Sequence, residues 1–157
     1  MSAGVGSTAI HRRVEALREG RDPSVIAKMP SGWAVFGERQ FLRGYALLLP
    51  DPVVPTLNDL PASARDLFLS DMSRLGDALL AVTGALRINY AMFGNLEPAL
   101  HAHVIPRYRE ESPPLDVAHP WAYDWNAAPV FDPAREAALL EAVRASLASG
   151  ASQSSRA

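Results

Sequence analysis

The chain has 157 residues, of which 48% are hydrophobic and 20% are charged, and its formal net charge is −2. These values suit one globular domain, and no run of lysine and arginine indicates binding of nucleic acid. The chain has no cysteine, which excludes disulfides, cysteine-ligated zinc and thiol nucleophiles. No apolar stretch suits a signal peptide or a membrane span of roughly 20 residues, so we expect a soluble cytoplasmic protein.

The N-terminal part of the chain predicts a short helix between two irregular segments. Residues 1–7 are small and glycine-rich, and we expect them to form a flexible tail. Ser7 or Thr8 is placed to cap a helix that ends at Gly20. We interpret residues 21–32, RDPSVIAKMPSG, as a connector.

A β-hairpin and a long helix follow. Residues 32–38 and 44–50 have the composition of strands and are close enough in the sequence to pair antiparallel. The second of them lacks polar alternation, which indicates a strand buried on both faces. A helix is predicted over residues 61–82, with Ser63 and Asp66 as a capping pair. Its apolar residues recur at helical spacings: Ala64, Leu67, Phe68, Met72, Leu75, Leu79 and Val82.

The C-terminal half adds two more strands and a last helix. Strands are predicted at residues 85–93 and 99–108, followed by an irregular segment at 109–131. A helix capped by Asp132 should end at Gly150, before a flexible tail at residues 151–157. Short turns between sequential strands imply antiparallel pairing. The whole chain, residues 1–157, is therefore predicted to be a single α+β domain, an antiparallel sheet of about five strands with a long helix packed on it.

Two of the four histidines, His101 and His103, lie in the last predicted strand. Residues i and i+2 of a strand point to the same face, so the two imidazoles should project side by side while Ala102 faces the other way. Such a pair suits two kinds of chemistry. It binds zinc if a third ligand, such as His11 or His119, joins it, or it supplies nucleophilic and acid–base groups at neutral pH.

The stretch HAHVIPRY, preceded by INYAMFGNLEPAL, resembles the signature of the histidine triad superfamily of nucleotide hydrolases and transferases. The resemblance covers residues 33–121. It implies that His101 is the nucleophile that takes the nucleotidyl group and that His103 supports it. Ala99 stands at the position of the first histidine, and Tyr45 stands where many members carry a further one. Since alanine cannot relay a proton, its presence should affect amine and alkoxide leaving groups more than polyphosphates.

The resemblance also implies contacts to a nucleotide. Asn89 matches an asparagine that lies near the nucleotide in the family, and Asn95 belongs to the turn that leads into the motif. Phe36 and Glu38 lie in the region that contacts base and ribose, where a glutamate accepts hydrogen bonds from ribose hydroxyls. Arg107 suits a bidentate contact to phosphate, because its planar guanidinium matches phosphate geometry. These five residues are the candidate substrate-binding residues.

The predicted function is hydrolysis or nucleotidyl transfer at the α-phosphate of dinucleoside polyphosphates or related nucleotides, through a covalent nucleotidyl-histidine. A catalytically weak nucleotide-binding protein of the same fold is an alternative, because Ala99 replaces a histidine. A metal-binding sheet protein is a second. No metal-ligand set is evident, and Mg²⁺ would enter with a polyphosphate substrate. The resemblance implies a homodimer, and Trp121 and Trp125 suit either a cover over the site or a dimer interface.

Overall fold

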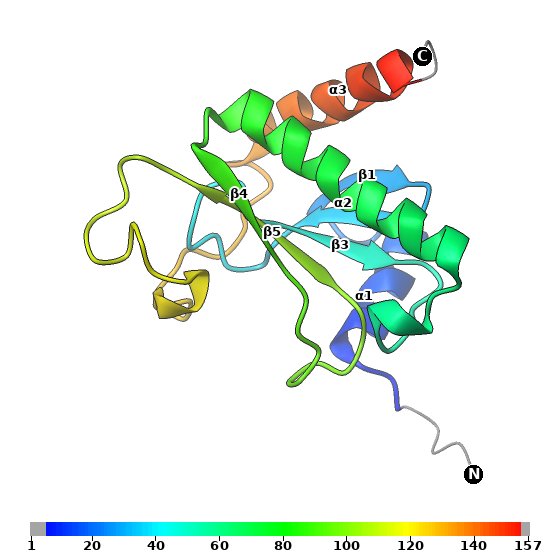
Figure 1. The fold of residues 1–157 in the computed structure, drawn as a ribbon. Coiled ribbons are helices and arrows are strands. Elements are labelled where there is room, and N and C mark those ends of the chain that lie inside the picture. Colours follow the sequence, from blue (N-terminus) through cyan, green and yellow to red (C-terminus); the bar gives the residue numbers. More distant parts are fainter. Residues whose placement is uncertain (1–5, 155–157) are drawn as a thin grey trace.

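The chain folds into a five-stranded antiparallel sheet with helices packed on both of its faces (Figure 1). A computed structural model describes residues 6–154, so the flexibility predicted for residues 1–5 and 155–157 lies outside the described part. The strand order in the sheet is β1-β2-β3-β5-β4. This arrangement confirms the predicted α+β fold and its antiparallel sheet.

Four of the five strands lie where the sequence predicts strands. The strands are Val25–Met29 (β1), Gly32–Phe36 (β2), Ala46–Pro50 (β3), Arg87–Ala91 (β4) and Ala102–Arg107 (β5). Every neighbouring pair is antiparallel. β3 occupies the centre of the sheet and is buried along its whole length, as its unbroken apolar run predicts.

β1 corrects the interpretation of residues 21–32 as a connector. In the described part of the chain it is an edge strand that pairs only with β2, and Met29 lies opposite Gly32 across a two-residue turn. Ile26 and Met29 are its buried residues, so the strand carries little apolar pattern of its own. Its conformation depends on hydrogen bonding to β2 and on half-burial, and a propensity estimate from sequence does not include either of these.

The helices are Ala9–Arg18 (α1), Ala62–Thr83 (α2) and Ala137–Ser154 (α3), with single 3₁₀ turns at Leu57–Asp59 (η1) and Pro120–Ala122 (η2). Thr8 caps α1, as predicted. The N-cap of α2 is Pro61, without a side-chain hydrogen bond, so the predicted capping pair of Ser63 and Asp66 is wrong. None of the helices within residues 6–154 is long and apolar enough to cross a membrane.

α3 begins and ends later than the sequence predicts. The carboxylate of Asp132 accepts hydrogen bonds from the backbone N–H groups of Ala134 and Arg135, so it stabilises a turn that precedes the helix. The helix continues through Gly150 to Ser154. Gly150 therefore does not end it, and part of the predicted tail at residues 151–157 is helical.

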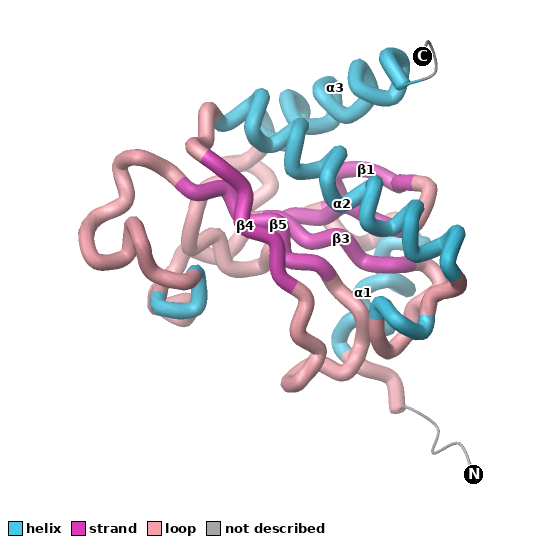
Figure 2. Tube along the Cα trace, viewed as in Figure 1, coloured by secondary structure: helices cyan, strands magenta, loops and turns pink. Residues whose placement is uncertain are grey.

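The sheet separates two hydrophobic clusters. One lies between the sheet and α2 with α3, and the other lies against α1. In β5, Ala102 and Val104 belong to the first cluster and Ile105 to the second, so His103 points to the α1 face by strand alternation. Figure 2 shows the segment 109–131 as loop interrupted by η2. Its residues Tyr123 and Trp125 pack on the same face of the sheet as α1.

Close contact between β2 and β3 predicts a strong effect of Gly32→Ala. A Cβ at this position would overlap the backbone carbonyl of Leu49, so we expect the substitution to lower the free energy of unfolding by about 1–3 kcal/mol. Gly150→Ala is the matched control, because nothing lies near its Cβ position and a helical alanine should stabilise by about 0.5–1 kcal/mol. Urea denaturation measures both. Equal stability of Gly32→Ala and the parent would contradict the packing described.

Candidate functional site

The two histidines of the motif lie side by side at the start of β5. His103 is the second residue of the strand, and His101 immediately precedes the strand. Their ring centroids are 4.9 Å apart and the ring planes are inclined by 72°. Both imidazoles therefore reach the same region on the α1 face of the sheet, in the arrangement that strand alternation predicts.

His101 has a defined tautomer. Its Nδ1 lies 2.7 Å from the carbonyl oxygen of Ala99, and a carbonyl oxygen only accepts hydrogen bonds. Nδ1 therefore carries the proton, and the lone pair of the ring is on Nε2. His101 is partly exposed, and no group within residues 6–154 is hydrogen-bonded to its Nε2. This nitrogen is thus available as a nucleophile.

His103 is a neutral and buried imidazole. Only 9% of the residue is exposed, and its Nδ1 is hydrogen-bonded to the hydroxyl of Tyr45 at 2.7 Å. Burial, together with the nearby His101, lowers the pKa of His103 to about 4. Burial also raises the pKa of the Tyr45 hydroxyl. Both members of this pair are therefore uncharged at neutral pH.

Aromatic side chains surround His103. The indole of Trp121 meets its ring edge-on with 5.0 Å between centroids, and Phe93 lies 4.8 Å from Trp121. Behind them, Trp125 stacks on Phe41 at 4.0 Å. Phe93 and Trp121 are 63% and 45% exposed, so they form an apolar wall that is open to a ligand. Of the two roles predicted for the tryptophans, the cover over the site matches these contacts.

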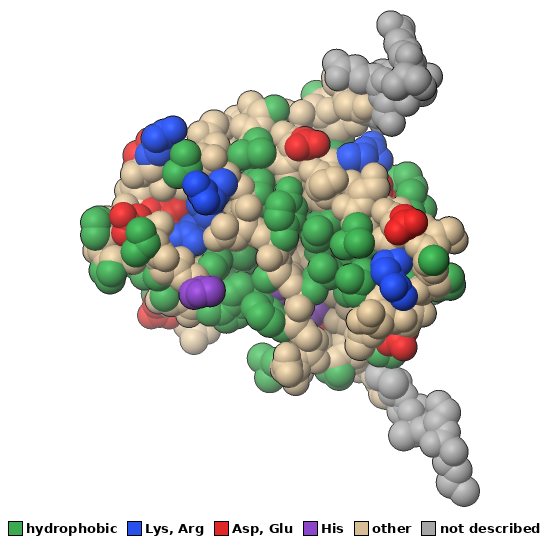
Figure 3. Space-filling model, in the orientation of Figure 1, with side chains coloured by type: hydrophobic (Ala, Val, Ile, Leu, Met, Phe, Trp, Pro, Cys, Tyr) green, Lys and Arg blue, Asp and Glu red, His purple; other side chains and the backbone are tan. Residues whose placement is uncertain are grey.

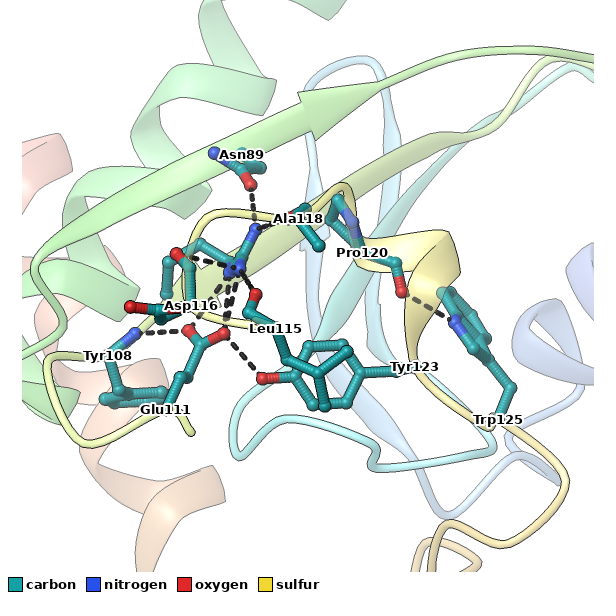
Figure 4. Close-up of polar contacts among 10 residues, drawn as sticks. Asn89, Tyr108, Glu111, Leu115, Asp116, Ala118, Pro120, Tyr123 and Trp125 are labelled. Atoms are coloured by element: carbon teal, nitrogen blue, oxygen red, sulfur yellow. Dashed lines mark hydrogen bonds and ion pairs between the residues drawn. The ribbon is translucent and has the colours of Figure 1, made fainter. Parts of the chain in front are cut away.

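Arg107 anchors the segment that carries the tryptophans, and Figure 4 labels the residues that accept its hydrogen bonds. Its guanidinium pairs with the carboxylate of Glu111 and also donates to Asn89 Oδ1 and to the carbonyl oxygens of Leu115 and Ala118. The side chains of Arg107 and Glu111 are only 8% and 3% exposed. Every N–H of the guanidinium is therefore used within the protein, and the phosphate contact predicted for Arg107 has no free donor.

The two candidate asparagines differ in their surroundings. Asn89 lies on β4 and accepts from Arg107 Nη1 at 2.8 Å. Because a guanidinium only donates, this bond places the amide oxygen toward Arg107. Asn89 lines the cleft beside β4, and within residues 6–154 its NH₂ group has no hydrogen-bond partner. Asn95 is exposed in the turn after Gly94, whose φ is +78°. No hydrogen bond joins Asn95 to the histidines in the described part of the chain.

Phe36 and Glu38 do not join the histidines. The Phe36 side chain is fully buried in the cluster under α2 and stacks on Phe131 at 5.6 Å. It thus lies on the opposite face of the sheet from His103, and its predicted contact with a nucleotide is wrong for the side chain. Glu38 is exposed beyond the end of β2, and within residues 6–154 its carboxylate has no hydrogen-bond partner.

Sequence reasoning missed two contacts of the motif loop. One is the backbone carbonyl of Ala99, which orients His101 and leaves no signal in the residue type. The other is Glu97, whose carboxylate accepts from the backbone N–H of Ile10 at 3.2 Å and so links the loop to the start of α1. Burial alone would raise the pKa of Glu97, but its hydrogen bonds and the nearby His101 lower it, so Glu97 is ionised beside the site.

A zinc site needs a third ligand beside the two histidines. His11 forms a capping box with Thr8 at the start of α1, and His119 is exposed at the cleft beside β4. Within residues 6–154, no group of three or more histidine, aspartate or glutamate side chains is close enough together to hold a metal ion. The described residues therefore do not supply the ligand set that the metal-binding alternative requires.

Comparison with known proteins gives the class of the fold. No family model and no curated protein matches the chain. Among solved structures, it resembles a histidine triad protein from Bradyrhizobium japonicum with a TM-score of 0.68 and 23% identity, over 90% of this chain and 98% of that one. It also resembles a histidine triad protein from Marinobacter aquaeolei VT8 with a TM-score of 0.71 and 18% identity, over 92% and 98%.

A third similar structure is a hypothetical histidine triad nucleotide-binding protein from Sulfolobus tokodaii, with a TM-score of 0.68 and 11% identity, over 87% of this chain and 91% of that one. These likenesses show that the chain has the histidine triad fold. The resemblance found in the sequence motif is therefore confirmed at the level of the fold.

Glu111→Gln tests the buried ion pair. Removing the carboxylate leaves the Arg107 charge buried without its partner, and we expect a loss of about 3–5 kcal/mol in the free energy of unfolding at pH 7. Glu141→Gln is the control, because Glu141 is 74% exposed beside Arg144 and should cost at most about 0.5 kcal/mol. Equal losses in urea denaturation would contradict a structural role of the pair.

Glu111→Gln also tests how the stability of the protein depends on pH. Burial opposes ionisation of Glu111, but hydrogen bonds from Arg107, Tyr123 and the Tyr108 backbone lower its pKa below the ordinary value of 4.5. Its contribution to stability is thus fully present above pH 4.5 and is lost as the pH falls through the lowered pKa. The stability difference between the parent and Glu111→Gln should therefore shrink in acid. A difference that stays constant with pH would contradict this assignment.

Proposed function

We propose that the protein is a nucleotide hydrolase or nucleotidyl transferase that works through a covalent nucleotidyl-His101. One observation carries the proposal: the Ala99 carbonyl holds the proton of His101 on Nδ1 and leaves an unpaired Nε2 beside the neutral imidazole of His103. The histidine triad fold and the nucleotide-binding description of the Sulfolobus protein support it.

In the first step, the lone pair of His101 Nε2 attacks the α-phosphorus of the nucleotide and forms a P–N bond. The bond between phosphorus and the leaving-group oxygen breaks, and that oxygen departs with the electron pair as an anion. The His101 ring is then cationic, and the Ala99 carbonyl stabilises it through the Nδ1–H bond. In the second step, water or another acceptor attacks phosphorus, the P–N bond electrons return to Nε2, and the acceptor releases its proton to the solvent.

The leaving group must depart without help from a protein acid. Position 99 is an alanine, His103 is neutral with a pKa of about 4, and the pKa of Tyr45 is raised by burial. The groups at the site therefore offer no acid of suitable pKa at neutral pH. A phosphate or polyphosphate leaves readily as an anion, so we infer that phosphoanhydrides, such as dinucleoside polyphosphates, are preferred to phosphoramidates.

Other parts of the substrate would meet groups in the cleft beside β4 and the aromatic side chains next to His103. The free NH₂ of Asn89 is a donor for a substrate oxygen, and the exposed rings of Phe93 and Trp121 suit an aromatic base. Mg²⁺ would arrive bound to the polyphosphate, where it neutralises charge on the leaving group. We also assign the protein to the reducing cytoplasm, in keeping with its lack of cysteine.

A nucleotide-binding protein without turnover is the second candidate function. Two observations favour it: alanine stands at the position of the first histidine, and the aromatic side chains cover His103. In this case, the same contacts would bind the nucleotide, but His101 would not reach the phosphorus in line with the leaving group.

We further propose that two copies of the chain associate along β4. Within residues 6–154, this strand has a partner on one side only, and an unpaired strand edge readily pairs with another chain. Tyr90 in this strand and Leu86 just before it are 42% and 45% exposed. Figure 3 shows hydrophobic side chains gathered over this region and along α2. Such a surface favours a symmetric dimer.

His101→Ala tests the nucleophile. We expect the parent to hydrolyse diadenosine tetraphosphate and to form an adenylyl adduct that mass spectrometry detects after acid-free quenching, whereas His101→Ala should show neither. Adenosine 5′-phosphoramidate should react at least about 100-fold more slowly than the tetraphosphate, because its amine leaving group needs an acid. His119→Ala is the matched control and should still form the adenylyl adduct, because His119 lines the cleft beside β4 but takes no part in the proposed bond formation. Binding of the tetraphosphate without turnover by the parent would favour the second candidate function.

Leu86→Glu tests the association along β4. The parent should sediment as a dimer at micromolar concentration, and the charged variant should sediment as a monomer, because an unpaired carboxylate in an apolar interface is costly. Val130→Glu is the control, since Val130 is similarly exposed, at 49%, outside β4. A monomeric parent, or a Leu86→Glu variant that stays dimeric, would contradict the proposed interface.

A further inference from the structure

We propose that Tyr45 is a positioning residue: its hydroxyl donates to Nδ1 of His103 and so holds the proton of His103 on Nε2. His103 then presents a hydrogen-bond donor, and not a base, to the phosphoryl oxygens at the site. This last consequence rests on the proposed function, whereas the assignment of the tautomer does not.

The direction of the hydrogen bond follows from counting donors and acceptors. Tyr45 is 3% exposed, and within residues 6–154 the only hydrogen-bond partner of its hydroxyl is His103 Nδ1. If His103 donated instead, the hydroxyl proton would be buried without an acceptor, which costs about 1–3 kcal/mol. If Tyr45 donates, both atoms are satisfied and the proton of the imidazole is left on Nε2, which is not sealed from solvent.

The protonation states agree with this direction. Burial raises the pKa of Tyr45, so the hydroxyl keeps its proton. Burial and the nearby His101 keep His103 neutral, so its ring has one nitrogen that donates and one that accepts. The charged group that acts on Tyr45 is the guanidinium of Arg13. A guanidinium only donates hydrogen bonds, so Arg13 is not another acceptor for the Tyr45 hydroxyl.

Packing keeps the Tyr45 ring in place. A Cβ on Gly37 would overlap the ring, so glycine makes room for it. Phe41 and Trp125 lie 5.0 and 5.1 Å from the ring, and the buried amide of Gln40 donates to the backbone carbonyls of Gly37 and Tyr45. The tyrosine therefore cannot swing away from His103 without disturbing the turn between β2 and β3.

The two imidazoles end up with opposite tautomers. The Ala99 carbonyl accepts from His101 Nδ1 and leaves a lone pair on Nε2, whereas the Tyr45 hydroxyl donates to His103 Nδ1 and leaves a proton on Nε2. The pair thus offers one nucleophile and one donor to the same phosphoryl group. If both rings had the same tautomer, the site would have two nucleophiles without a donor, or two donors without a nucleophile.

Nitrogen NMR of uniformly ¹⁵N-labelled protein at pH 7, without ligand, tests the proposal, because two-bond proton–nitrogen correlations identify the protonated nitrogen of each imidazole. We expect protonated Nε2 for His103 and protonated Nδ1 for His101 in the parent. Tyr45→Phe should convert His103 into a mixture of tautomers and leave His101 unchanged. Tyr123→Phe is the matched control: it removes a hydroxyl that donates to Glu111 in the same aromatic group and should leave both tautomers unchanged.

A parent His103 that is protonated on Nδ1, or a Tyr45→Phe variant whose His103 stays entirely protonated on Nε2, would overturn the proposal. If Tyr45→Phe does not fold, the parent spectrum alone still decides the direction of the hydrogen bond. Turnover of diadenosine tetraphosphate should fall about 10- to 100-fold in Tyr45→Phe, by analogy with residues that orient metal-ligating histidines, and should not fall in Tyr123→Phe. If the parent shows no turnover, the proposed function is refuted. The NMR spectrum would still test whether Tyr45 holds the proton of His103 on Nε2.

Discussion

The pairing of β3 with β5 at the centre of the sheet is the constraint on which the candidate site depends. It places Leu47 opposite His103 and Ala46 opposite Val104. It therefore joins the hairpin from the N-terminal third of the chain to the strand that carries the histidines. Tyr45 and His103 are 58 residues apart in the sequence, and they meet only because of this register. A shift by one residue would turn the imidazoles into the apolar cluster under α2.

A second constraint acts from the other side of the site. The buried guanidinium of Arg107 ties segment 109–121 to β4 through Glu111, Asn89 and two backbone carbonyls. That segment carries Trp121, which packs against His103. The polar cluster thus supports an apolar environment several residues away, and this environment is what keeps His103 neutral. The stability of segment 109–121 therefore affects the pKa of His103.

The sequence predicted those parts of the structure that depend on local pattern. The amphipathic stripe of α2, the unbroken apolar run of β3 and the alternation around His101 and His103 all have periods that report the conformation directly. β1 has no such pattern, because its partner strand determines it. The same limit applies to the site. Arg107 has the chemistry of a phosphate ligand, but its N–H groups are bonded to acceptors whose positions depend on the tertiary fold. Phe36 lies on the α2 face of the sheet, and the sheet register, which the sequence does not show, determines that face.

Ala99 and Tyr45 also limit which side chains the site accepts at these two positions. Both residues belong to the hydrophobic cluster against α1, and Ala99 is 0% exposed. An imidazole added at position 99 alone would have to enter a space that is already packed, at a cost of about 1–3 kcal/mol. A histidine at position 45 alone would withdraw the hydroxyl from His103. Each of these two changes, made alone, is therefore expected to disturb either the packing or the hydrogen bond that holds the two imidazoles in place.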